Sequence, residues 1–129
     1  MEKSCGAIVI DNGKILLVRQ NKGHYSFPKG HMELGETEIE TSIREVKEET
    51  NIDIEIDDIS KRYTINYKMN NGVRKEVVYF IAKPLTYDLK RQESEISEVL
   101  WVSINDVYNI ISYDNMKELW INIKKDLGE

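Results

Sequence analysis

Residues 30–52, GHMELGETEIETSIREVKEETNI, decide which fold and chemistry the sequence predicts. The second half of this stretch has helical spacing and carries Arg44 followed by three glutamates, Glu45, Glu48 and Glu49. At about 100° per residue, the three carboxylates point to one side of a helix. Carboxylates crowded in this way repel one another unless a positive charge lies among them. We therefore expect a divalent metal ion at this helix, and such an ion commonly holds phosphate oxygens.

The helix is predicted over residues 37–50, where Thr37 and Glu40 have the spacing of a capping box. Its apolar residues fall away from the carboxylates and are expected to form the buried stripe: Ile39, Ile43 and Val46. A solvated helix with an ordinary charged surface is the alternative interpretation. The fixed positions of Gly30 and Glu36 ahead of the helix favour a functional site instead.

Composition restricts the class of protein. The 129 residues, 40% hydrophobic and 32% charged, predict a single globular domain over residues 1–129. A net charge of -5 argues against stable nucleic-acid binding. The sequence shows no leader and no long apolar run, so we expect no membrane association. The only cysteine, Cys5, is expected to be a small core residue in a cytoplasmic protein. Two histidines and one cysteine give poor support to a zinc site.

The rest of the chain alternates between strand-like and helix-like patterns. Strands are predicted at 7–10, 14–19, 54–67, 74–82 and 99–102, and an Asn-Gly pair at 12–13 indicates a hairpin between the first two. Loops are predicted at 21–30 and 84–94, and further helices at 104–111, capped by Ser103, and at 115–127. Strands interleaved with a few helices predict an α/β fold with one mixed sheet covered on both faces.

The stretch 30–52 closely resembles the Nudix box, G-x5-E-x7-R-E-U-x-E-E-x-G-U, in which U is aliphatic. Eight residues match at the correct spacing: Gly30, Glu36, Arg44, Glu45, Val46, Glu48, Glu49 and Ile52. Asn51 stands where the pattern has glycine, and asparagine is the next best residue for a left-handed conformation after a helix. The resemblance implies a Nudix-type α/β/α sandwich with a mixed central sheet.

The resemblance also implies an activity. Nudix enzymes hydrolyse a nucleoside diphosphate linked to a further group, using Mg2+ or Mn2+. The metal ligands implied are the Gly30 carbonyl, Glu48 and Glu49, while Glu45 is either a ligand or the base that orients water. Arg44 and Glu36 are expected to be essential because their pairing holds the loop and helix together.

Many members of the family recruit one more carboxylate from late in the chain. Glu95 is the residue that we expect in this role, and Glu98 is the second candidate. Plain surface glutamates are the alternative interpretation for both.

A second resemblance concerns the substrate. Residues 25–31, YSFPKGH, are similar to the W-x-F-P-K-G-H stretch of asymmetric dinucleoside tetraphosphate hydrolases, with tyrosine in place of tryptophan. Lys29 and His31 are then expected to contact phosphate, and Lys75 a distal phosphate, with ordinary surface residues as the alternative interpretation for His31 and Lys75. Tyr79, with Tyr67 or another tyrosine, is expected to stack on adenine, although packing in a strand is the alternative.

These expectations combine into one leading function and several alternatives. The leading function is metal-dependent hydrolysis of diadenosine tetraphosphate to ATP and AMP by a monomer or homodimer that acts on small nucleotides. The enzymatic alternatives are pyrophosphohydrolases of RNA 5′ ends or of ordinary or oxidised nucleoside triphosphates, with diphosphoinositols as another substrate class of related branches. A non-catalytic nucleotide sensor and a fortuitous acidic helix are the alternatives without catalysis.

Overall fold

The computed structural model describes residues 1–129 as eight strands and three helices. The strands are β1 (Glu2–Asp11), β2 (Lys14–Gln20), β3 (Tyr25–Ser26), β4 (Lys29–His31), β5 (Ile54–Ile56), β6 (Tyr63–Lys68), β7 (Arg74–Pro84) and β8 (Ile96–Ser103). The helices are α1 (Glu38–Thr50), α2 (Val107–Ile110) and α3 (Asp114–Asp126). None of these helices is long and apolar enough to cross a membrane.

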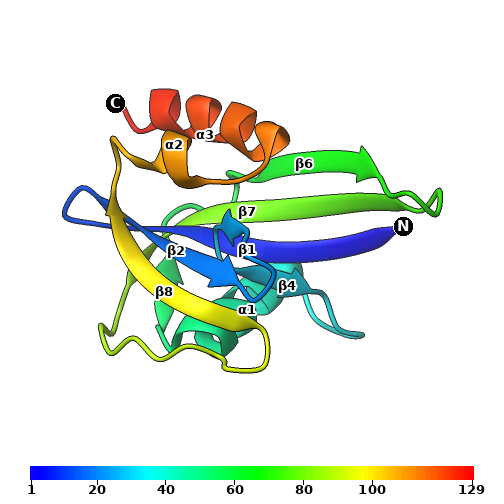
Figure 1. The fold of residues 1–129 in the computed structure, drawn as a ribbon, viewed down its shortest axis with the longest axis horizontal. Helices are drawn as coiled ribbons and strands as arrows, with labels where there is room; N and C mark the ends of the chain where they lie inside the picture. The colour runs from blue at the N-terminus through cyan, green and yellow to red at the C-terminus, as the bar shows by residue number, and fades with distance from the viewer.

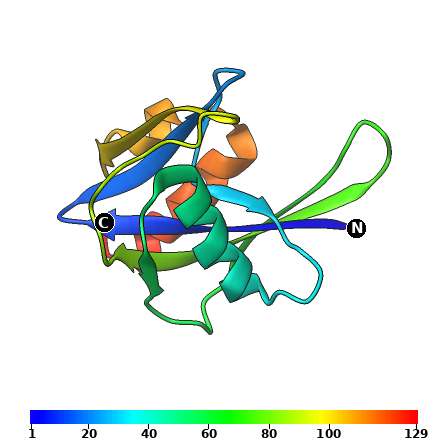
Figure 2. The same ribbon diagram turned by 90° about the horizontal axis from the view of Figure 1, so that it is seen from below.

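The long strand β1 lies at the centre of a mixed sheet. It pairs in parallel with β7 and antiparallel with β2 and β4, while β8 pairs with β2, and β5 and β6 pair with β7. Helix α1 covers one face, and α2 and α3 cover the other (Figure 1). The β6–β7 hairpin extends away from the body of the molecule, beside the N-terminus (Figure 2). The predicted α/β fold with a mixed sheet covered on both faces is therefore confirmed.

Both faces of the sheet carry a hydrophobic core. Ile8 packs with Trp120 and Ile123 under α3, whereas Ala7 and Val9, on alternate positions of β1, pack on the α1 side. All five side chains are fully buried, as expected of a strand covered on both faces. Cys5 is also fully buried, which confirms it as a core residue, and its burial raises the pKa of the thiol to about 11.

Three predicted boundaries were wrong. The strand expected over 54–67 is interrupted because the Asp58 carboxylate accepts hydrogen bonds from the Ser60 backbone and hydroxyl, which forms a turn. The helix expected from 104 begins only at Val107, and Ser103 makes no helix cap. The loop expected over 21–30 contains β3 and the start of β4, because Lys29–His31 pairs with distant residues of β1.

Candidate active site

Helix α1 begins and ends where its sequence predicts. The Thr37 hydroxyl accepts a hydrogen bond from the Glu40 N–H at 3.1 Å, and the Glu40 carboxylate accepts one from the Thr37 N–H at 2.9 Å. Asn51 ends the helix in the left-handed conformation, with φ of 69°. Asparagine thus supplies the conformation for which the family pattern has glycine. These caps fix where α1 begins and ends, and so they fix the direction in which its glutamates point.

The buried side of α1 differs from the predicted stripe. Val46 is buried, but Ile43 is 38% exposed, and Ser42 and Glu49 are buried instead. The helix packs against β1 and β4. The face of α1 that makes this contact lies nearer to the glutamates than the spacing of the apolar residues predicted. The face that packs on the sheet and the face that carries the glutamates therefore overlap at Glu49.

Gly30 lets the glutamates approach the sheet. A Cβ atom at this position would overlap the carboxylate of Glu45, while the backbone conformation itself does not require glycine. One residue earlier, the Lys29 N–H donates a hydrogen bond to Glu49 Oε1 at 3.1 Å. Strand β4 therefore seats two of the three clustered carboxylates against its backbone.

Arg44 joins the helix to the preceding loop. Its guanidinium donates to Glu36 at 2.6 and 2.9 Å, to the His31 carbonyl at 2.9 Å, to Glu45 at 2.8 Å and to Glu48 at 3.1 Å. The Glu36 carboxylate also accepts from the Glu33 N–H and the Thr41 hydroxyl. The hydrogen bond from Arg44 is the main cause that lowers the pKa of Glu36 to about 2. The arrangement has the bidentate geometry of a strong structural ion pair.

Burial shifts the pKa of three further charged groups of the site, Glu49, Glu45 and Lys29. Burial raises the pKa of Glu49 to about 8 and also raises the pKa of Glu45. Burial, and then the nearby charge of Lys75, lower the pKa of Lys29. The charges of these acidic and basic groups are therefore only partly neutralised by one another, as is common where a charged ligand binds.

A cleft of about 410 Å³ collects these groups. Its lining includes Gly30, the acidic residues Glu49 and Glu95, and the basic residues Lys29, His31 and Lys75. Lys75 Nζ lies 3.3 Å from His31 Nε2. Ser4, a buried residue of β1, also lines the cleft, and its hydroxyl has no hydrogen-bond partner.

The structure distinguishes the two late glutamates. Glu95 is brought to the cleft by the loop before β8, where its carbonyl accepts from the Asn21 N–H at 2.9 Å. The Glu95 charge also contributes to raising the pKa of Glu49. Glu98 lies within β8, in register with Arg19, and does not line the cleft.

The donor set suits a hard divalent cation, because the acidic part of the site offers oxygen donors of the kind that Mg2+ prefers. These are the Gly30 carbonyl and the carboxylates of Glu45, Glu48, Glu49 and Glu95. No three of the chain's His, Cys, Asp or Glu side chains form a ready metal site, and Glu45 and Glu48 instead accept hydrogen bonds from Arg44. The residues fit the metal, provided that these two carboxylates turn from Arg44 toward the cleft.

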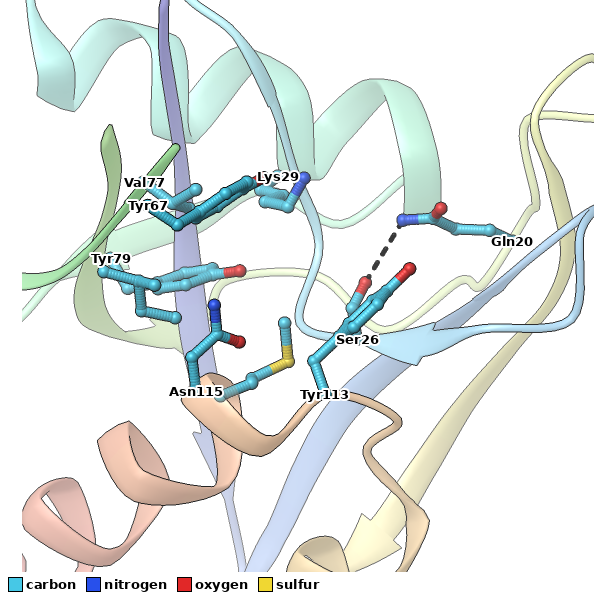
Figure 3. A pocket seen from close by; sticks show the side chains of 10 residues that line it. Gln20, Ser26, Lys29, Tyr67, Val77, Tyr79, Tyr113 and Asn115 are labelled. Atoms are coloured by element: carbon cyan, nitrogen blue, oxygen red, sulfur yellow. Dashed lines mark hydrogen bonds between the residues drawn. The ribbon is translucent and has the colours of Figure 1, made fainter. Parts of the chain in front are cut away.

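A second cavity, of about 420 Å³, opens beside the cleft and lies between β6, β7 and the start of α3 (Figure 3). Its walls include Tyr67 and Tyr113, which are 41% and 44% exposed, and Asn115. Tyr79 is fully buried and packs edge-on against Phe27, with 5.6 Å between ring centroids. The stacking role expected for the Tyr79 ring does not fit this burial, although its hydroxyl, which has no partner, points into the cavity (Figure 3).

With this geometry established, the comparison with known proteins is direct. Residues 2–121 match the NUDIX domain. The chain belongs to the Nudix family. The asymmetrical bis(5′-nucleosyl)-tetraphosphatase of Rattus norvegicus is 29% identical to this chain over 131 residues, which cover 89% of the chain and 88% of the rat protein. The structure of a C. elegans Ap4A hydrolase binary complex superposes with a TM-score of 0.85, at 28% identity and with coverage of 99% and 98%.

Other Nudix relatives are longer proteins. Mutator protein MutT4 of Mycobacterium tuberculosis is 31% identical over 132 residues, which cover 92% of this chain and 52% of that protein. Nudix hydrolase 2 of Arabidopsis thaliana is 36% identical over 113 residues, which cover 81% and 40%. The chain thus spans about half of these two proteins or less.

Most of the Nudix residues expected from the sequence lie together in this structure. Sequence reasoning missed four residues that line the second cavity, namely Gln20, Ser26, Tyr113 and Asn115, and also Ser4, Asn21, Lys22 and Ser94 in the cleft. Of the four at the second cavity, only Ser26 lies in a quoted stretch, at the unspecified second position of residues 25–31, and the pair Gln20 and Ser26 is more than eighty residues from the pair Tyr113 and Asn115. Only the polar or aromatic character of these side chains could have suggested a role in binding, and that is a weak signal.

Proposed function

We propose that this Nudix protein hydrolyses a phosphoanhydride bond of a nucleoside diphosphate-linked substrate, and that the substrate is diadenosine tetraphosphate, cleaved to ATP and AMP. The observation that carries the proposal is the joined pair of cavities: a cleft with carboxylates and lysines opens beside a pocket with tyrosine walls. The first suits a polyphosphate chain and the second a nucleobase. Similarity to the rat tetraphosphatase along nearly its whole length supports this substrate.

The side chains of the cleft divide the work of binding. Lys29, His31 and Lys75 line the cleft and would hold the phosphate oxygens. Tyr67 offers an exposed ring to an adenine, whereas Tyr79 contributes its hydroxyl. Buried lysines with few counter-charges gain more from a phosphate than exposed ones do, because water screens them less.

The carboxylates carry the chemistry. Glu45, Glu48, Glu49 and Glu95, with the Gly30 carbonyl, would hold Mg2+ or Mn2+. When bound, the metal neutralises phosphate charge and lowers the pKa of a water molecule. In this structure Arg44 donates hydrogen bonds to Glu45 and Glu48, and Glu36 fixes Arg44; the two carboxylates would turn from Arg44 toward the cleft to hold the metal. Glu45, which is seated against Gly30, is either one of the ligands or the group that takes the proton of the attacking water.

The test is release of nucleotide products from a panel, with Mg2+ and with a chelator. The panel contains diadenosine tetraphosphate, triphosphorylated RNA, ordinary and oxidised nucleoside triphosphates, nucleotide sugars and diphosphoinositols. We expect magnesium-dependent conversion of diadenosine tetraphosphate to ATP and AMP, well above the others. We expect Glu48→Gln and Glu49→Gln to lower its rate by orders of magnitude, with Glu98→Gln as the matched control.

Two results would count against the proposal. Faster turnover of another member of the panel would reject the substrate while keeping the reaction class. Full activity of the Glu48→Gln/Glu49→Gln double variant would reject the assignment of the site itself.

A further inference from the structure

The side chain of Gln20 lies at the junction of the two cavities. Gln20 and Lys29 are the residues that line both the cleft and the tyrosine-walled pocket. Lys29 carries a positive charge suited to phosphate, whereas Gln20 offers a neutral amide with donors and an acceptor. Of the two residues that span the boundary, Gln20 is thus the one suited to a neutral polar group.

A bulge in the sheet fixes the backbone at this position. The pairing of β2 with β8 is regular up to Arg19 and Glu98, and its register shifts between Arg19 and Gln20. Beyond the shift, the Gln20 N–H donates to the His24 carbonyl at 2.8 Å, and the Gln20 carbonyl accepts from the Gly23 N–H at 2.7 Å. Bulges redirect a side chain out of the regular alternation of a strand. Here the bulge and turn hold Gln20 at the mouth of the pocket.

The polar groups at this mouth have unused hydrogen-bonding capacity. The only hydrogen bond of the Gln20 side chain joins its Nε2 atom to Ser26 Oγ at 3.5 Å, which is long (Figure 3). Ser26 is 1% exposed, and its hydroxyl has no other hydrogen-bond partner. Buried polar groups are normally satisfied, so a buried hydroxyl and an amide left in this state at a cavity mouth suit a ligand.

The group that a nucleotide would place here follows from its connectivity. If the base occupies the tyrosine-walled pocket and the phosphates occupy the cleft, the sugar lies between them. Ribose presents two neighbouring hydroxyls, each of which donates and accepts, and an amide with a serine hydroxyl complements such a pair. We propose that Gln20 and Ser26 bind the ribose hydroxyls and make the enzyme select ribonucleotides over deoxyribonucleotides. This inference rests on the proposed function.

The test compares diadenosine tetraphosphate with its 2′-deoxy and 3′-deoxy analogues. We expect the wild-type protein to prefer the ribo substrate over at least one analogue by about tenfold or more in kcat/KM, as for loss of one well-formed hydrogen bond. Gln20→Ala and Ser26→Ala should lower kcat/KM for the ribo substrate and leave that analogue nearly unchanged, so the preference collapses. Gln92→Ala is the matched control, because its side chain lines neither cavity and makes no hydrogen bond.

Two outcomes would overturn the inference. One is an equal loss of activity toward all three substrates in both variants, which would assign Gln20 to phosphate binding or to structure. The other is a wild-type protein that does not distinguish the sugars. Thermal unfolding of each variant separates a folding defect from lost recognition, and Ser26→Ala serves if Gln20→Ala does not fold.

Failure of the proposed function is recognised separately. A wild-type protein that hydrolyses none of the three substrates with Mg2+ would reject the proposed function. Binding of AMP against 2′-deoxy-AMP and 3′-deoxy-AMP, measured by calorimetry, would still report the sugar subsite. Equal affinity for all three in that measurement would reject the subsite too.

Discussion

Replacing Gly30 with alanine tests how the carboxylates are seated against the sheet. The added Cβ would overlap Cδ and both oxygens of the Glu45 carboxylate. The Glu45 side chain must then move and lose its hydrogen bond from Arg44, which measures 2.8 Å. The substitution should therefore affect both stability and hydrolysis.

The magnitude follows from these two contacts. Overpacking of this kind costs about 1–3 kcal/mol, and a hydrogen bond to a charged group contributes about 1.5–3 kcal/mol. Arg44 is partly exposed, so the lower part of the second range applies. We expect a loss of about 3 kcal/mol in the free energy of unfolding, which lowers Tm by about 10 °C, and hydrolysis reduced about a hundredfold or more.

Denaturant unfolding and product release provide the assay, with Gly35→Ala as control. Gly35 has a φ of +86° and open space around it, so alanine there strains the backbone by about 1–2 kcal/mol without displacing a carboxylate. Its hydrolysis should be unchanged. A double-mutant cycle with Glu45→Ala isolates the clash, because removing that carboxylate should relieve most of the cost of Gly30→Ala. Equal costs of Gly30→Ala with and without the Glu45 carboxylate would refute this reasoning.

Three further predictions concern other parts of the site. Burial raises the pKa of Glu49 from 4.5 to about 8 in the folded protein, so the stability that this group contributes to the metal-free protein should be fully present below about pH 4.5 and be lost as pH rises through 8; Glu49→Gln should remove this part of the pH dependence in denaturant melts with chelator. Thr37→Ala removes the cap of α1 and should cost about 1 kcal/mol in the same melts while hydrolysis persists, and an unchanged midpoint would contradict the capping role. Glu95→Gln should raise the Mg2+ concentration needed for half-maximal hydrolysis about tenfold or more, whereas Glu98→Gln should not, and equal effects would remove Glu95 from the metal site.

Helix α1 shows how much of the structure the spacing of nearby residues can predict. The capping box at Thr37, the left-handed Asn51 and the order of the box glutamates are all relations between residues close in the chain, and the structure has the helix and both caps as predicted. The buried side of the helix was predicted less well. Apolar spacing placed Ile43 inside, but close contact with β4 turned Glu49 inward instead.

The predictions for the first hairpin and for the loop at 21–30 were likewise right only where adjacent residues decide the structure. The Asn-Gly pair after β1 correctly predicted the first hairpin, because turn geometry depends on adjacent residues. The start of β4 fell in a predicted loop, because Lys29–His31 becomes a strand only by pairing with Ser4, Cys5 and Gly6.

Spacing along the chain was thus sufficient to predict the Nudix box, the helix that carries its clustered glutamates and the class of fold. Tertiary structure alone decided that Glu95 rather than Glu98 reaches the cleft, and that Gln20 and Ser26 meet at the mouth of a pocket whose far wall includes Asn115. The physical reason is that the part of the box on α1 is specified by the local backbone geometry of one helix. A pocket is the space left between elements far apart in sequence, and its walls depend on how the sheet twists, bulges and packs against α3.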